Sequence, residues 1–454
     1  MKNKILDYKL DLIYLLIIVF VSLIIRAYLI NSIPVNITGD ESWDLSHIYR
    51  IIFDKNFSAF TFLGDGSVSA IVFYPVAFLI SLFGIENSVI FLRLNIIAYS
   101  LLSLIAFYFL LKQDSSRIIS FLFTLLLSAN YVFLNFSRTA WVNMMSVCSG
   151  LFMILFIEKA AREKKDIWYL IAGFFGGISF YGYHFGRILV IGMIAYLLFD
   201  LFLSRFNKQK IKCFIIFLLL ILLTTLPIFF KVNSAGSESI LRRPNATFAF
   251  SQENLSNSSS SMKDMLFHQI SYTFRGFIVF DESIMNEGIE NSRYVPSNTS
   301  PINLVIKVLF ILGLIYFVFK KKMYIWWFVI ASILITQVTS VLPPNFSRGI
   351  FYLPVIYFIC GVFVYNLIFK ISTKFRINKN SIYALIIVFS LFIFIYDLKL
   401  YFSWMKEAYV EKVRQPAISY NEFNDWQNYQ INIIKRGDYP INNYDWYNLR
   451  NSLK

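Results

Sequence analysis

The chain contains a series of apolar segments, each long enough to cross a lipid bilayer. Segments of roughly 18 to 22 apolar residues span about 30 Å of hydrocarbon, and lipid offers the backbone no hydrogen-bond partner, so each must be helical. The 454 residues are 57% hydrophobic and only 15% charged, which is more apolar surface than a soluble core of this size buries. The sequence therefore predicts an all-α polytopic membrane protein. The first run, residues 12–33, is too long for a signal-peptide core, and we expect an uncleaved span.

The polar breaks between these segments fall into two sets. One set is rich in lysine and is expected to face the cytoplasm; it comprises residues 1–9, 158–166, 204–212, 320–322 and 370–380. The other set is richer in aromatic residues, glycine, proline and lone arginines and is expected outside; it comprises residues 135–141, 179–187 and 341–349 and the long loops 34–87 and 232–302. The net charge of +15 is therefore explained by lysine-rich loops that set the orientation of the protein among membrane lipids. No nucleic-acid partner is expected.

Residues 69–84 decide the topology because they are apolar but short, and Pro75 interrupts them. If they crossed the membrane, every later lysine-rich break would face outside, so we expect a helix lying at the outer interface. Residues 265–280 are a second interfacial candidate. About eleven transmembrane helices are then expected, starting near residues 12, 88, 117, 140, 167, 187, 213, 303, 323, 349 and 381.

The chain is expected to be a multi-pass plasma-membrane protein with two parts. Residues 1–399 form the transmembrane domain, and residues 400–454 form an external C-terminal tail.

A dense acidic motif, ITGDESWDLSHIYR, follows the first span. Thr38 and Glu41 have the spacing of a capping box, in which two side chains bond unpaired amides at a helix start. Asp40, Asp44 and His47 are not accounted for in this way. On a helix these three share one face, where they can hold a divalent metal ion or orient a catalytic base. Asp40, Asp44 and His47 are therefore candidate metal ligands, and no other cofactor is indicated.

Three arginines lie at the expected outer ends of different spans: Arg138, Arg187 and Arg348. Each has a simple explanation as an anchor at the membrane interface. Together they also suit a phosphate-bearing lipid, because a guanidinium group binds phosphate through two parallel hydrogen bonds. A carboxylate base beside a phosphate site is the outline of a transferase.

Over roughly residues 10–370, the order of these features resembles the GT-C class of integral-membrane glycosyltransferases. The resemblance is to the group related to protein O-mannosyltransferases and the lipid A aminoarabinose transferase, in glycosyltransferase families 39 and 83. The matching elements are Asp40-Glu41, the segment YPVAFLISLFGIENSVIFLRLN with Pro75, Gly84 and Arg93, then FSRTA with Arg138, YGYHFGR with Tyr181, Tyr183 and Arg187, and FSRGIFYLP with Arg348 and Pro354. The chain departs from the pattern in two places. The segment GSVSAIVFYP lacks the usual cation before the interfacial helix, and His184 is unusual in its element.

The resemblance implies a donor made of a sugar on polyprenyl phosphate and transfer at the outer face of the membrane to a protein, lipid or glycan acceptor. Asp40 is the expected base, which takes the proton of the acceptor nucleophile, and Glu41 is its acidic neighbour in the catalytic pair. The leaving lipid phosphate is expected to meet the donor-binding residues Arg138, Tyr183, His184, Arg187 and Arg348, or a metal ion.

Three other functions compete with this one. A transporter or flippase of a lipid-linked glycan predicts charges near the middles of the spans, which apart from Arg26 are almost free of them. A surface-polysaccharide polymerase or ligase predicts arginine-rich external loops and no early acidic motif. A non-catalytic membrane assembly factor is favoured by loss of Asp40, which is present.

Overall fold

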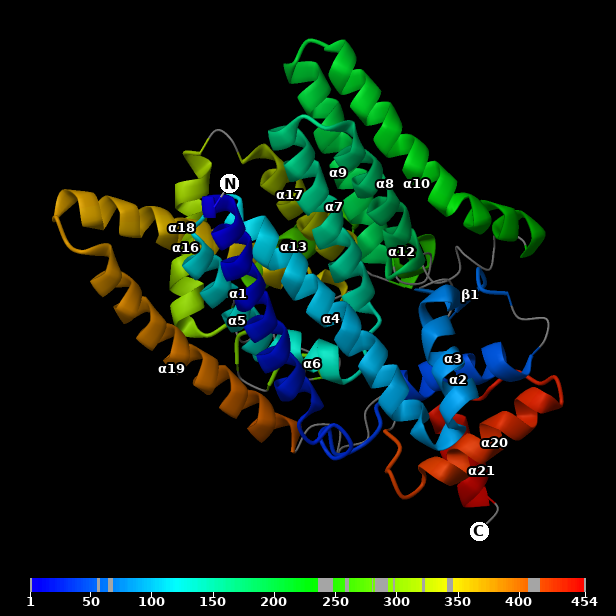
Figure 1. Ribbon diagram of the computed structural model, residues 1–454. Coiled ribbons are helices and arrows are strands. Elements are labelled where there is room, and N and C mark those ends of the chain that lie inside the picture. Colours follow the sequence, from blue (N-terminus) through cyan, green and yellow to red (C-terminus); the bar gives the residue numbers. More distant parts are fainter. Residues whose placement is uncertain are drawn as a thin grey trace.

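The computed structural model describes residues 2–54, 58–63, 68–235, 248–257, 261–279, 281, 293–296, 299–320, 323–340, 346–406 and 417–452. Almost all of its regular structure is helical, which confirms the all-α prediction (Figure 1). Of the expected external loop 232–302, residues 236–247, 258–260, 280, 282–292 and 297–298 lie outside the described residues, as do residues 341–345 of the expected external break at 341–349.

Each of the eleven expected spans coincides with a helix. These helices are α1 (Lys2–Ala27), α4 (Ser88–Lys112), α5 (Arg117–Ala129), α7 (Asn143–Glu163), α8 (Asp166–Tyr181), α9 (His184–Leu203), α10 (Lys208–Ala235), α16 (Leu304–Val318), α17 (Tyr324–Thr339), α18 (Tyr352–Lys374) and α19 (Lys379–Met405). Among the described residues, seven of them are long and apolar enough to cross a membrane on their own.

The other four are shorter, and the count of eleven crossings stays a prediction. Helix α5 continues into α6 (Tyr131–Arg138) after a bend of 62°, and this pair would make an eighth span. Helices α8, α16 and α17 have 16, 15 and 16 residues, so a straight crossing of about 30 Å exceeds their length of about 24 Å. Asn130 explains the bend after α5, because its side-chain Oδ1 accepts hydrogen bonds from the amides of Val132 and Phe133 and so starts α6.

Two ends of the helical bundle are defined by contacts between α1 and its neighbours. Near the N-terminus, Asp11 of α1 forms ion pairs with Lys112 and Arg117, at the end of α4 and the start of α5. At the opposite end, Arg138 of α6 donates to the carbonyls of Ile25 and Arg26 at 2.6 and 2.8 Å. We call this second end, where α1 and α6 end and α4 begins, the α2 end.

The segment between α1 and α4 leaves and re-enters the bundle at the α2 end. It contains α2 (Gly39–Phe53), the paired strands β1 (Phe62–Leu63) and β2 (Val68–Ser69), the 3-10 turns Ala70–Phe73 and Ile85–Asn87, and α3 (Tyr74–Phe83). Helix α3 packs against α2 and α4 and has ten residues. Ten residues are about 15 Å long, which is too short for a straight crossing of about 30 Å, and the interfacial position of residues 69–84 stays a prediction.

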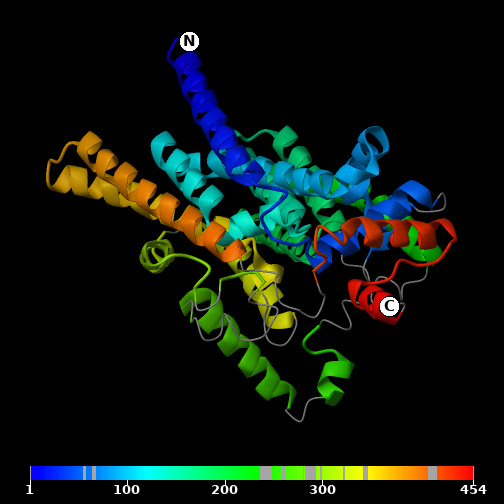
Figure 2. The same ribbon diagram turned by 90° about the horizontal axis from the view of Figure 1, so that it is seen from below.

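Two smaller groups of elements complete the described structure. Helices α12 (Gln252–Asn257) and α13 (Met262–Phe274) are followed by a π-helical turn, η3 (Arg275–Val279), over the second interfacial candidate. A 3-10 turn, η4 (Phe346–Gly349), precedes α18. The C-terminal segment, residues 417–452, contains α20 (Phe423–Lys435) and α21 (Asn443–Ser452) and lies against α2 in both views (Figures 1 and 2).

Candidate functional site

The predicted capping box is confirmed at the start of α2. The amide of Glu41 donates to Thr38 Oγ1 at 3.1 Å, and the amide of Thr38 donates to Glu41 Oε2 at 2.9 Å. Glu41 also forms a buried ion pair with Arg93 of α4, whose Nε lies 2.6 Å from Oε1 and whose Nη2 lies 3.1 Å from Oε2. Both carboxylate oxygens of Glu41 are thus engaged away from solvent. We assign Glu41 to holding α2 on α4 and leave it out of proton transfer.

Removing Glu41 should therefore cost stability. Glu41→Ala leaves the Arg93 guanidinium buried without its carboxylate, which is expected to destabilise the protein by about 3–5 kcal/mol. Glu422→Ala is the matched control, because Glu422 pairs with Arg450 at a site where both side chains remain partly exposed, and such a pair contributes at most about 1 kcal/mol. Thermal unfolding of the detergent-purified variants measures the difference. Equal shifts for the two variants would contradict the assignment.

Asp40 lies in the first turn of α2 and is the accessible carboxylate of the pair. Its side chain is 38% exposed, whereas that of Glu41 is fully buried. Asp40 Oδ2 forms an ion pair with Arg293, which comes from the loop before α16. The Arg293 guanidinium lies over the ring of Trp141, with its carbon 5.6 Å from the ring centroid. An accessible carboxylate held beside a cation and an indole ring is suited to act on a ligand from the α2 end.

Sequence reasoning did not identify Arg293. It lies 253 positions from Asp40, inside a long polar loop, so no local pattern joins the two. One sequence feature could have identified Arg293: it is a lone arginine next to an aromatic residue, Tyr294, and the FSRTAW element has a similar composition. Tyr294 packs against Trp141 and Phe136 with ring centroids 5.0 and 5.5 Å apart, which fixes the loop at residues 293–296.

Arg348 and His184 come together from η4 and the first residue of α9. Arg348 Nη1 lies 3.3 Å from His184 Nε2, and Arg348 is 7% exposed. Among the described residues, Arg348 Nε is buried without a hydrogen-bond partner, and no carboxylate forms an ion pair with this guanidinium. A buried guanidinium without a carboxylate is costly, so an anionic ligand would stabilise it.

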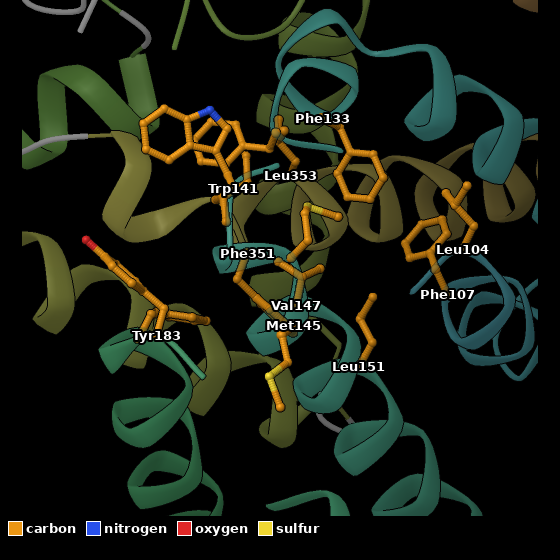
Figure 3. Close-up of a cluster of buried hydrophobic side chains, with 14 of the residues drawn as sticks. Leu104, Phe107, Phe133, Trp141, Met145, Val147, Leu151, Tyr183, Phe351 and Leu353 are labelled. Atoms are coloured by element: carbon orange, nitrogen blue, oxygen red, sulfur yellow. The ribbon is translucent and has the colours of Figure 1, made fainter. Parts of the chain in front are cut away.

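Tyr183 packs on His184, with the two ring centroids 4.0 Å apart. Figure 3 shows Tyr183 at the same edge of the apolar cluster as Trp141, with its hydroxyl directed away from Phe351. Beneath this edge, Phe351 and its neighbours form a closely packed interior. Trp141 and Tyr183 therefore form part of the edge of the apolar cluster.

The other two predicted arginines differ from each other in their surroundings. Arg187, one turn into α9, donates to the carbonyls of Phe180 and Gly182 at 3.1 and 3.4 Å, which holds it beside His184 at the end of α8. Arg138 is fully buried, and besides its bonds to α1 it donates to the carbonyls of Tyr28 and Ile33. Because Arg138 binds four main-chain carbonyls where α1 ends, we leave it out of the donor site.

The structure does not group the candidate metal ligands. Among the described residues, no three His, Cys, Asp or Glu side chains lie close enough to hold a metal ion. His47 is buried and packs edge-on against Trp43, and neither ring nitrogen has a hydrogen-bond partner in the part of the chain that the structure describes. Burial and the nearby Arg50 lower the pKa of His47 to about 3, so the ring is neutral near pH 7. Asp44 is half-buried one turn from Asp40. A metal ion at Asp40, Asp44 and His47 therefore stays a prediction and has no part in the mechanism below.

Two groups of residues thus lie at the α2 end, and the connection between α6 and α7 joins them. The first is Asp40 with Arg293; Asn135 of α6 donates to the carbonyl of Arg293 at 3.1 Å. The second is Arg348 with His184, Tyr183 and Arg187; Ser146 in the first turn of α7 donates to the carbonyl of Tyr183 at 3.2 Å. A base and a cationic site for an anion are the two parts that a transferase of a phosphate-linked group requires.

Comparison with known proteins gives one family match and one similar fold. Residues 68–229 match the family model described as dolichyl-phosphate-mannose-protein mannosyltransferase. The fold is similar to the crystal structure of an Archaeoglobus fulgidus oligosaccharyltransferase tethered to an acceptor peptide containing the NVT sequon, with a TM-score of 0.57 and 13% identity. That match covers 93% of this chain and 59% of the oligosaccharyltransferase chain, so this chain spans about three fifths of its length. No curated protein sequence matches significantly. The family match and the shared fold support a glycosyltransferase of the GT-C class, as the sequence motifs predict.

Proposed function

We propose that the protein transfers a sugar from a polyprenyl-phosphate donor to a protein, lipid or glycan acceptor at the outer face of the plasma membrane. The observation that carries this proposal is the arrangement at one end of the bundle: an accessible carboxylate, Asp40, and a buried guanidinium, Arg348, without a carboxylate partner among the described residues. The family model matched by residues 68–229 is described by a phosphate-linked sugar donor, which supports the same class of substrate.

In the proposed reaction, Asp40 accepts the proton of the acceptor nucleophile as that nucleophile attacks the anomeric carbon. The new bond forms at this carbon while its bond to the phosphate oxygen breaks, and the lipid phosphate leaves with the electron pair. Arg348 and Arg187, with His184 and Tyr183 beside them, meet the charge of the departing phosphate. One base is sufficient because the phosphate is already a good leaving group.

Comparison of cells with and without the gene tests this function. Mass analysis of surface proteins, lipids and glycans should reveal one class of molecule that loses a single sugar residue when the gene is deleted. A surface composition unchanged by deletion would contradict the proposal. Purified protein in vesicles should also release free polyprenyl phosphate from the donor, whereas a flippase would move the donor across the bilayer intact.

The proposed sidedness has its own test. Reporter fusions after residues 86 and 114 lie on either side of α4, which is the second long apolar helix. We expect an external signal at residue 86 and a cytoplasmic signal at residue 114, because residues 69–84 return to the end of the bundle from which α2 departs. A cytoplasmic signal at residue 86 would place the candidate site on the opposite face.

A further inference from the structure

The C-terminal segment binds the helix that carries Asp40 through buried polar contacts. Gln427 of α20 donates to Tyr49 Oη at 2.6 Å and to Ser88 Oγ at 3.1 Å, which links α2 to the start of α4. The backbones of Ile37 and Ile418 form an isolated antiparallel bridge just before α2. Buried amide side chains lose their hydrogen bonds to water, so such contacts specify one position of the two elements.

One of these contacts leads directly to Asp40. Asn443, the first residue of α21, is 4% exposed and donates from Nδ2 to Ser42 Oγ at 2.6 Å. Ser42 is fully buried, and its hydroxyl donates to the carbonyl oxygen of Gly39 at 2.9 Å. That carbonyl belongs to the peptide bond that joins Gly39 to Asp40. Two hydrogen bonds in series therefore connect the C-terminal segment to the peptide group of the candidate base.

We propose that Asn443 is a positioning residue for Asp40, acting through Ser42 and the Gly39 carbonyl. The inference rests on the proposed function, in which Asp40 is the base. In the first turn of a helix the amide N–H groups have no intrahelical partner, so the peptide group between Gly39 and Asp40 is held from its carbonyl side, where Ser42 donates. Asn443 orients Ser42, whose single proton then points to the Gly39 carbonyl, and this fixes the plane from which Asp40 projects. A displacement of about 1 Å in a reacting group can cost about 100-fold in rate.

A control variant can distinguish the positioning role of Asn443 from general support of the fold. Gln430 of α20 is also a buried amide of the C-terminal segment, but its Nε2 donates to the carbonyl of Ile441 within the same segment. Gln430→Ala therefore removes a comparable hydrogen bond without touching α2. It is the matched control for Asn443→Ala.

Kinetics of the full-length variants in vesicles test the proposal. Asn443→Ala should lower kcat about tenfold or more and change the donor and acceptor KM values less than about twofold. Gln430→Ala should leave kcat within about twofold. Because Asn443 acts through one hydroxyl, Ser42→Ala should produce a similar loss, and the double variant should lose no more than the larger single loss. Additive losses, or equal losses in Asn443→Ala and Gln430→Ala, would overturn the proposal.

A second measurement does not depend on activity. Hydrogen exchange of the amides of residues 39–42 should be about fivefold faster in Asn443→Ala than in Gln430→Ala, since one hydrogen bond to this turn is lost. Unchanged exchange would overturn the positioning role. Failure of the proposed function has a different result: the wild-type protein would transfer no sugar, or Asp40→Asn would be active, whatever the exchange data show.

Discussion

Asp40→Asn is expected to abolish sugar transfer while leaving the amount of folded protein in the membrane unchanged. Asparagine keeps the size of the side chain but cannot accept the proton of the nucleophile, and loss of a positioned base typically costs 10²–10⁴-fold. The carboxylate is 38% exposed, and its ion-pair partner is Arg293 in a loop, so the neutral amide should leave the fold intact. Initial rates of transfer from a labelled polyprenyl-phosphate sugar in vesicles provide the measurement.

Asp54→Asn is the control for this prediction. Asp54 caps the other end of α2 and lies 3.7 Å from Arg50, so it undergoes the same chemical change on the same helix away from the site. We expect its rate to remain within about twofold of the wild type, because a surface ion pair of this kind contributes at most about 1 kcal/mol. Full activity of Asp40→Asn would remove Asp40 from the role of base.

Arg348→Ala is expected to weaken use of the lipid donor by about 10- to 150-fold in kcat/KM. Charge-assisted hydrogen bonds contribute about 1.5–3 kcal/mol each, and the guanidinium is 7% exposed, where solvent does little to screen it. Arg348→Lys should recover only part of the loss, because lysine retains the charge but not the two parallel donors. Arg187→Ala should act in the same direction. Saturation curves with donor, at fixed acceptor, measure these effects.

A surface arginine controls for the loss of one positive charge. Arg275 is half-exposed and pairs with Asp281 at 2.6 Å, so Arg275→Ala should leave kcat/KM for the donor within about twofold. If Arg187→Ala and Arg348→Ala both show unchanged dependence on donor concentration, the phosphate site lies elsewhere.

The sequence predicted those features that depend on local pattern. The hydrophobic runs located eleven helices of the described structure, and the spacing of Thr38 and Glu41 predicted the capping box that starts α2. Such features are predictable because their causes lie within a few residues of each other. The length of each helix was not predictable in the same way. For example, α5 ends at a bend that one side chain, Asn130, causes within an apolar run.

The pairing of charges could not be predicted, because it depends on packing between distant segments. Glu41 and Arg93 are 52 positions apart, and their burial shows that this member of the acidic pair holds two helices together. Arg138 looked like the other outer arginines, yet it binds the main-chain carbonyls at the end of α1. Arginines in similar sequence contexts therefore have different environments, and only the tertiary structure distinguishes them.

The bond between Asn443 and Ser42 also has a consequence for biogenesis. The two residues are separated by 401 positions, so at about 5–20 residues per second the ribosome needs about 20–80 s to supply the partner of Ser42 after α2 has emerged. During this time the membrane-inserted nascent chain already carries Asp40 but lacks the last contact of its supporting turn. We expect chains truncated before α21 to transfer sugar at about one tenth of the full rate or less, so that full activity begins only when translation has passed α21.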